Sequence, residues 1–207
     1  KRQVPVEVEA DAEEVEAQPT WDDLVESPSS SPGEPLRVAW LALSELGPKA
    51  PRGRIGFCRA PGRGPSGQRR AILGSDLDRL VALHEVDHLV LLLDPAELSG
   101  LGIAELEVEA QARRLVLAPC PIAPGERPSS QALDETVRFI LAVARAGRRV
   151  AVISRDAQER AGVIASACLV ALGLPAETAL RSSRSLLGPR AAASDPQRTF
   201  VLSMKSR

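Results

Sequence analysis

The segment RVAVISRDAQERAGVIASACLVAL, from Arg149 to Leu172, decides the fold. Its first part, Arg149–Ser154, is nearly all apolar, as is typical of a strand covered on both faces. Its last part, Arg160–Leu172, is apolar and rich in alanine and stops at Gly173, which indicates a buried helix. A short polar loop that ends in arginine joins the two. Because loop amides and a helix N-terminus converge at such a turn, we expect an anion site here.

The rest of the chain alternates strand-like and helix-like segments. The expected strands are Leu36–Leu43, Arg54–Cys58, Asp87–Leu93 and Arg114–Ala118. The expected helices are Ser75–His84, with Ser75 as N-cap, Leu101–Arg113, Ser129–Ala146, Pro175–Leu187 and a last one from Asp195. This order predicts an α/β fold: a mostly parallel central sheet flanked by helices on both faces.

Charge divides the chain in two. Residues 1–35 hold two basic and ten acidic side chains, a net charge of −8, which leaves +7 for the remainder. They end in a Pro/Ser-rich stretch, so we predict a disordered acidic tail and linker over 1–35 and one folded domain over 36–207. The apolar cluster Thr20–Val25 is either an incidental part of a solvated tail or a docking segment. The sequence starts at Lys1 and is either complete or a fragment of a longer chain.

The composition argues against several classes of protein. No apolar run reaches the roughly 20 residues that span a bilayer, so we expect no membrane span. Cys58, Cys120 and Cys168 are odd in number and widely spaced, which favours a reducing, cytoplasmic setting over a disulfide framework. The chain has 2 Trp, 3 Phe and no Tyr, which is too few for a base-stacking platform, so nucleic acid is not the expected partner.

Two short motifs have structural explanations. His84-Glu85-Val86-Asp87-His88 matches the H-E-x-x-H pattern of zinc hydrolases, which requires the pentapeptide to be helical. Here it lies where a helix should give way to a strand, so zinc hydrolysis is a minor alternative and we expect neither metal nor cofactor. Gly62–Gly67 matches G-x-G-x-x-G, but Pro65 removes one amide donor and Gln68–Gly74 is expected to be loop, which favours a surface loop over a dinucleotide site.

The turn after Ser154 resembles the H-C-x5-R-[S/T] phosphate loop of cysteine-dependent protein tyrosine and dual-specificity phosphatases. The spacing from Ser154 to Arg160 is kept. Val38–Ser44, Ile55–Gly62 and Pro121–Pro128 are similar, in the same order, to segments of the cyclin-dependent-kinase-associated phosphatase subfamily. The resemblance covers about Leu36–Leu187 and implies a dual-specificity-phosphatase-like fold.

The resemblance also assigns roles, and most of the required groups are missing. The nucleophile position is Ser154 and the general-acid position is Pro124, with Glu126 as the nearest substitute. The position of the leaving-group hydroxyl is Ala161, and only the phosphate-binding Arg160 is kept.

Other replacements lie inside and beside the loop. Ile153 replaces the histidine before the nucleophile, and Ala157 and Glu159 replace glycines whose backbone turns aim amides inward. The vestigial anion-binding loop consists of Ser154, Arg155, Asp156, Ala157, Gln158, Glu159 and Arg160.

We therefore expect a pseudophosphatase, a phosphatase-like domain without turnover that binds or scaffolds proteins. The partner implied by the resemblance is a protein kinase or a phosphoprotein. The alternative is a weakly active protein tyrosine or serine/threonine phosphatase.

Overall fold

The computed structural model describes residues 34–43, 46–47 and 50–205. The strands are β1 (Ala39–Trp40), β2 (Arg54–Arg59), β3 (His88–Leu91), β4 (Val116–Pro119) and β5 (Arg149–Ser154). The helices are η2 (Ser66–Gln68, a 3-10 turn), α2 (Arg69–Ala82), α3 (Pro95–Leu101), α4 (Leu106–Ala112), α5 (Ser130–Arg145), α6 (Glu159–Ala171), α7 (Ala176–Leu187) and α8 (Asp195–Leu202). The predicted tail and its Thr20–Val25 cluster lie outside the described residues.

The five strands form one sheet in the order β1-β2-β5-β3-β4. β1 pairs antiparallel with β2, and the other pairs are parallel. β5 is central: its Ser154 is in register with Arg59 of β2, and its Val150 with His88 of β3. The predicted α/β class with a mostly parallel sheet is confirmed.

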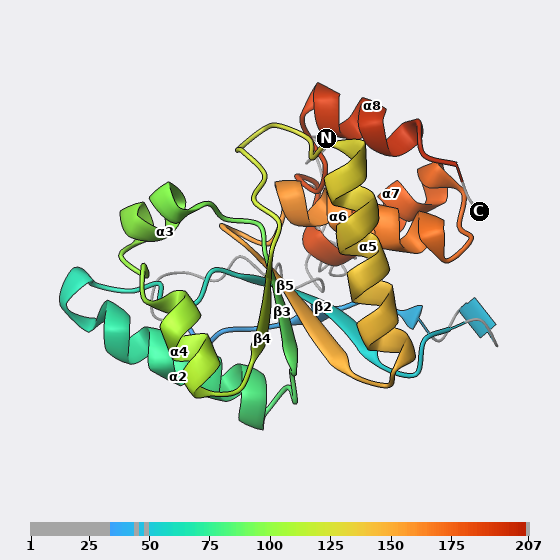
Figure 1. Cartoon of the computed structure of the whole chain (residues 1–207). Helices are drawn as coiled ribbons and strands as arrows, with labels where there is room; N and C mark the ends of the chain where they lie inside the picture. Colours follow the sequence, from blue (N-terminus) through green and yellow to red (C-terminus); the bar gives the residue numbers. More distant parts are fainter. Residues whose placement is uncertain (1–33, 44–45, 48–49, 206–207) are drawn as a thin grey trace, which may run out of the picture.

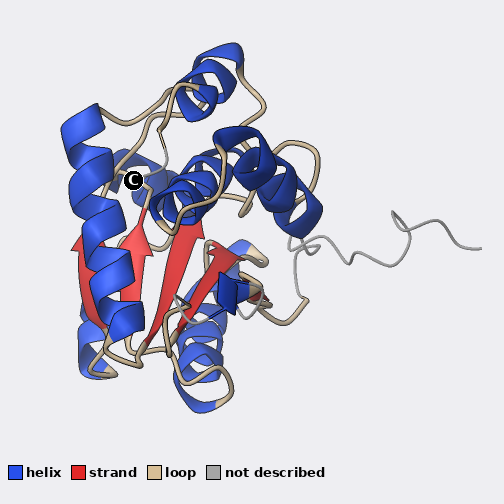
Figure 2. Cartoon of the chain, turned by 90° about the vertical axis from the view of Figure 1, so that its right-hand side faces the viewer, coloured by secondary structure: helices blue, strands red, loops and turns tan. Residues whose placement is uncertain are grey.

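Helices cover both faces of the sheet (Figures 1 and 2). Alternation along the strands sends successive side chains into two separate cores. Val90 and Val152 pack with α5, α6 and α7, whereas Leu89 and Ile153 pack with α2 and α4 on the other face. This two-sided burial explains why β3 and β5 are apolar runs without polar alternation.

Two helices explain how the central strand is held. α5 begins where the Ser129 hydroxyl accepts a hydrogen bond from the Ala132 amide at 3.1 Å, as its predicted N-cap should. α6 is buried from Arg160 to Val170. At Gly162 it lies so close to the turn before α8 that a Cβ would come within 2.6 Å of the Ala191 side chain, so only glycine fits.

Three predicted elements are wrong in extent. The helix predicted for Ser75–His84 begins at Arg69 and needs no side-chain cap there. The helix predicted for Leu101–Arg113 is two helices, because α3 ends at Gly102 in the left-handed region with φ +68°. The strand predicted for Leu36–Leu43 is only Ala39–Trp40.

A search of the described helices for a membrane span gives none that combines the necessary length and apolarity.

Candidate functional site

The candidate site lies at the carboxyl end of β5. At this point the helices that connect the strands change from one face of the sheet to the other. The helices that follow β2 and β3 pack on one face, whereas α6, which follows β5, packs on the other. In open α/β sheets such a change leaves a crevice at the strand ends, where ligands bind. The 154–160 loop occupies this place, as the sequence predicts.

Ser154 is enclosed by its own loop. The residue is 1% exposed, and its hydroxyl oxygen accepts a hydrogen bond from the Ala157 amide at 3.0 Å. Ala157 has φ +60°, a conformation in which a side chain costs about 1 kcal/mol relative to glycine. The inward turn expected of a glycine at this position is therefore made by alanine. Glu159 is the first residue of α6 and lies outside the left-handed region, so the glycine-like turn expected at this position is not present.

Arg160 joins three segments of the chain. Its Nη1 donates to the Leu92 carbonyl at 3.2 Å and to the Ile122 carbonyl at 2.7 Å. The Glu97 carboxylate accepts hydrogen bonds from Nη1 at 2.7 Å and from Nη2 at 2.8 Å, which makes the pair bidentate. The Arg160 side chain is 5% exposed and the Glu97 side chain is 12% exposed. Of the five guanidinium hydrogens, those on Nε and one on Nη2 have no hydrogen-bond acceptor among residues that the structure describes.

Glu97 was missed by sequence reasoning, which assigned no role to the α3 N-terminus. It is the third residue of α3 and forms a capping box with Asp94, whose carboxylate accepts from the Glu97 amide at 2.7 Å. The signal D-P-x-E marks a helix start. The capping box fixes Glu97 near the carboxyl end of β3, and from there its carboxylate reaches Arg160.

Arg190, on the turn after α7, binds two side chains of the loop. This role was not predicted from the sequence. Its Nε donates to the Gln158 carboxamide oxygen at 2.5 Å, and its Nη2 pairs with Asp156 at 3.0 Å. Arg155 is exposed, and its carbonyl is 3.5 Å from Nη1 of Arg63. The side chains of Asp156 and Gln158 thus bind Arg190 and not a free anion site.

The general-acid position is on a separate, tethered turn. Pro124 is exposed and precedes Gly125, whose carbonyl accepts from the Ser194 hydroxyl at 2.8 Å. The Glu126 carbonyl accepts from Nε2 of Gln197 at 2.9 Å, while the Glu126 side chain is exposed. Ala161 is buried with no exposed surface. Pro124 and Ala161 carry no acidic proton, and among the described residues the Glu126 carboxylate makes no hydrogen bond to the loop.

The two histidines are separated as predicted. His84 lies two residues beyond α2, and His88 is the first residue of β3. His84 lies beside the Trp40 ring at 6.3 Å, whereas His88 lies beside Phe139 at 5.8 Å on α5. Burial lowers the pKa of each. Within the described ranges, no three His, Cys, Asp or Glu side chains gather as a metal site would require.

The Gly62–Gly67 segment serves the fold. The Gly62 amide donates to Asp76 at 3.0 Å, and Asp76 pairs with the fully buried Arg59 at 3.5 Å. The predicted loop over Gln68–Gly74 is wrong, because α2 starts at Arg69. Gly62 holds φ +77°, and its amide is used inside the protein.

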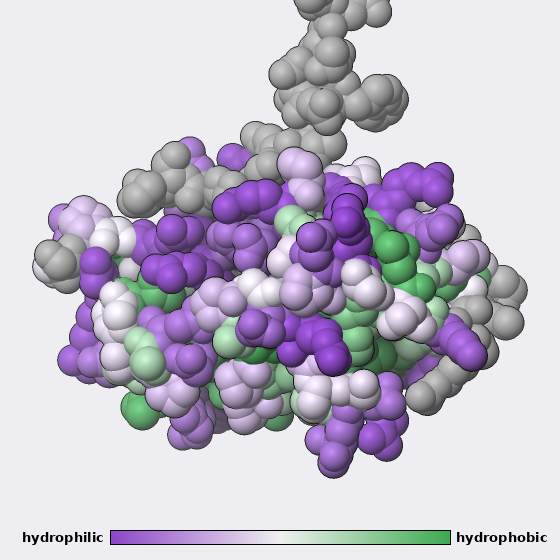
Figure 3. Space-filling view, turned by 90° about the horizontal axis from the view of Figure 1, so that it is seen from above, coloured by the Kyte–Doolittle hydropathy of each residue, from purple (hydrophilic) through white to green (hydrophobic). Residues whose placement is uncertain are grey.

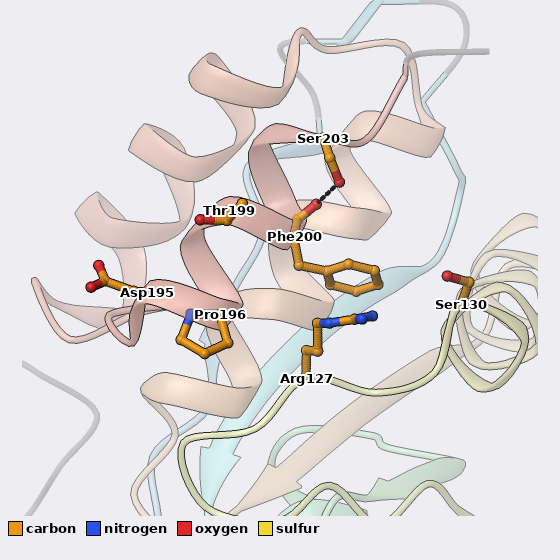
Figure 4. Close-up of a pocket in the computed structure, with 7 residues that line it drawn as sticks. All are labelled: Arg127, Ser130, Asp195, Pro196, Thr199, Phe200 and Ser203. Atoms are coloured by element: carbon orange, nitrogen blue, oxygen red, sulfur yellow. Dashed lines mark hydrogen bonds between the residues drawn. The ribbon is translucent and has the colours of Figure 1, made fainter.

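A groove of about 590 Å³ lies beside the Pro124 turn, between the start of α5 and α8 (Figure 4). Arg127 lies 4.9 Å from the centre of the Phe200 ring, and both side chains point toward Ser130. Seen from above, this side of the molecule is mainly hydrophilic with smaller hydrophobic areas (Figure 3). The groove size is within the range of small-ligand sites.

Neither a scan of protein-family models nor a search of curated proteins gives a match to the sequence. Solved structures do match. A kinase associated phosphatase (KAP) whose catalytic cysteine is replaced by serine superposes with TM-score 0.73 at 22% identity, over 82% of this chain and 93% of that chain. Tk-PTP in its active form gives 0.58 at 26% identity, over 72% and 89%. PTPMT1 in complex with PI(5)P gives 0.58 at 16%, over 73% and 88%.

Proposed function

We propose that this protein, which has the fold of the dual-specificity and protein tyrosine phosphatase superfamily, is a pseudophosphatase. In this proposal it binds other proteins and does not hydrolyse phosphate esters. The observation that carries the proposal is the state of Ser154. The hydroxyl at the nucleophile position is buried and bonded to the loop amide of Ala157. It is a serine where the family's chemistry needs a thiolate.

No histidine of the chain is placed to activate this hydroxyl. A serine nucleophile needs an adjacent base, since its own proton is not lost at neutral pH. His88 is in register with Val150, four residues before Ser154 on the neighbouring strand, which corresponds to about 13 Å. His84 precedes the same strand and is farther along in the same direction.

A cysteine from elsewhere does not replace the missing thiolate. Burial raises the pKa of Cys58 to about 12 and that of Cys168 to about 12, and burial also raises the pKa of Cys120. These thiols remain protonated at neutral pH, and the protonated form is a poor nucleophile. The proton donor for the leaving group is also missing, because Pro124 has no acidic hydrogen.

The binding role has support in the same loop. Arg160 retains two N–H groups that are free of partners within the described ranges, and α6 starts at the loop with its positive dipole end. We propose that the partner is a protein kinase or a phosphoprotein. The kinase associated phosphatase is the neighbour whose name supports a kinase. Three unpaired thiols favour the cytoplasm as the location.

The second candidate is a weakly active phosphatase. The inward turn at Ala157 and the remaining donors of Arg160 favour it, because both are parts of a working phosphate loop. This candidate requires that the loop bind phosphate in a geometry from which hydrolysis proceeds.

Hydrolysis of p-nitrophenyl phosphate by the full chain separates the two candidates. We expect no turnover above the buffer blank, and turnover abolished by Arg160→Met would establish the weak phosphatase. We also expect the double variant Ile153→His/Ser154→Cys to stay at background, because Pro124 still supplies no proton and loss of such an acid costs about 10²–10⁴-fold. Pro124→Asp and Ala161→Ser, added to the double variant, are the matched test of that explanation.

Binding is measured separately, by calorimetry with a phosphotyrosine peptide and with inorganic phosphate. Binding without turnover supports the pseudophosphatase, and the unphosphorylated peptide is the control. Robust turnover by the double variant, lost on Arg160→Ala, would contradict the proposal.

A further inference from the structure

The amino end of the sheet, opposite the 154–160 loop, gathers arginines from separate elements. We call this surface the arginine edge. It consists of Arg52, Arg54, Arg79, Arg145, Arg148 and Arg149. They belong to the start of β2, the last turn of α2, the last turn of α5 and the start of β5.

Backbone contacts place these segments together. Arg54 and Arg149 are register partners in adjacent parallel strands, and the Arg54 amide donates to the Arg148 carbonyl at 3.2 Å. The Gly53 amide donates to the Ala144 carbonyl at 2.8 Å, which brings the segment before β2 against the end of α5.

His84 shows that Arg79 belongs to the same group. The Arg79 carbonyl accepts from the His84 amide at 3.1 Å, and Nη1 of Arg149 donates to the His84 carbonyl at 3.1 Å. The His84 ring is in contact distance of Trp40, and Arg54 lies 4.4 Å above the Trp40 ring centre. Two aromatic rings, Trp40 and His84, therefore lie beside the guanidinium groups of the arginine edge.

The charge on this edge is only partly balanced by the folded domain. Asp87 pairs with Arg148 at 3.1 Å, and Glu85 pairs with Arg149. The remaining four arginines have no carboxylate partner in the part of the chain that the structure describes: Arg52, Arg54, Arg79 and Arg145. Six positive and two negative charges leave a net +4 on one edge, enough to attract a polyanion.

We propose that the arginine edge is a docking surface for the chain's own acidic segment, Glu7–Glu26. This segment has nine carboxylates, and there is no Lys or Arg between Gln3 and Gly33. It joins the domain at Glu34, eight residues after Glu26, a length that spans up to about 28 Å when extended. Nη2 of Arg59, the last residue of β2, donates to the Glu34 carbonyl at 2.7 Å, so the described chain starts at the carboxyl end of the sheet. A six-residue strand is about 20 Å long, so the acidic segment reaches the amino end of the sheet.

Because the acidic segment is part of the same chain, even a weak attraction is sufficient for it to occupy the arginine edge. A segment joined covalently to its docking surface by a short linker is held there at an effective concentration in the millimolar range. An acidic partner protein must therefore compete with the tail for the arginine edge. Because this edge is about 20 Å from the phosphatase-like loop, docking there leaves the loop open.

A spin label in the full chain tests the proposal. A nitroxide is attached through Ala12→Cys, since the native thiols are buried and do not compete for the label. We expect amide signals of residues 145–149 to broaden at low ionic strength, while those of the 155–158 loop stay sharp. Broadening should fade in 0.5 M NaCl, where the Debye length falls to about 4 Å.

Charge reversal supplies the specific control. Arg52→Glu/Arg145→Glu, at two exposed positions without side-chain partners in the described ranges, should reduce the docked population about tenfold. The matched variant Arg181→Glu/Lys205→Glu changes the net charge equally, at exposed positions outside the arginine edge that also lack side-chain partners in the described ranges, and should leave the broadening intact.

Three outcomes would overturn the proposal. The first is absence of broadening at low salt, and the second is equal loss in both reversal variants. The third is binding of a short oligothymidylate to residues 145–149 with no broadening from the tail label, which would assign the edge to nucleic acid instead.

Discussion

The pair between Glu97 and Arg160 makes a quantitative prediction for the variant Glu97→Gln. Both side chains are nearly buried, and Arg160 also satisfies the carbonyls of Leu92 and Ile122. Neutralising Glu97 leaves a guanidinium charge without a counter-ion in a nearly buried site. Breaking a buried pair from one side costs about 3–5 kcal/mol, and we expect about 3 because the glutamine oxygen keeps one hydrogen bond.

Urea unfolding followed by circular dichroism measures this cost. A loss of about 3 kcal/mol corresponds to a fall in Tm of about 6–12 °C for a domain of this size. Glu107→Gln, on the exposed side of α4, is the matched control and should stay within about 0.5 kcal/mol of the wild type.

The double variant Glu97→Gln/Arg160→Met decides whether the two residues act as one unit. We expect the double variant to lose about as much free energy of unfolding as one single variant, since the first change already breaks the pair. Additive losses, or a cost for Glu97→Gln below about 1 kcal/mol, would refute the structural role assigned to this pair.

Three further outcomes follow from local features. Ala157→Gly should raise the free energy of unfolding by about 1 kcal/mol in urea titrations, since glycine holds φ +60° without strain; a loss would contradict the assigned backbone conformation. Burial lowers the pKa of His84 and of His88 below 6.5, so the unfolded chain binds more protons and stability should fall as pH drops below about 6.5; His84→Gln/His88→Gln should flatten that slope. Burial raises the pKa of Cys58 and Cys168 to about 12, so Ellman's reagent should react with them only after unfolding, and rapid native-state reaction would show that they are accessible.

Sequence reasoning predicted the elements whose signals are local. β5 was predicted at its observed bounds because its apolar run is continuous, and α5 within one residue at each end because Ser129 caps it and Gly147 follows it. The start of α2 was missed because Gln68 makes no side-chain cap, so nothing in the sequence marks Arg69 as the first helical residue. The break between α3 and α4 was missed because a single glycine, here Gly102, is tolerated inside a helical pattern.

In the site, too, the features with local sequence signals were predicted and the long-range contacts were not. The strand, loop and helix around Ser154 were predicted because they are contiguous in sequence. The partners of the loop were not, because Glu97 is 63 residues from Arg160 and Arg190 is 32 residues from Gln158. Such pairs depend on how α3 and the turn after α7 pack against the sheet, which composition and periodicity do not specify.

Arg160 also has a consequence for how the chain folds. Its guanidinium needs the end of β3, the start of α3 and the segment after β4 to be in place together. Contacts separated by tens of residues pay the entropy of loop closure before they gain energy. We therefore expect the bonds of Arg160 to form late, after the carboxyl end of the sheet has assembled, and to slow unfolding more than they speed folding. On this expectation, an arginine at this position extends the lifetime of the native state even when no phosphate is bound.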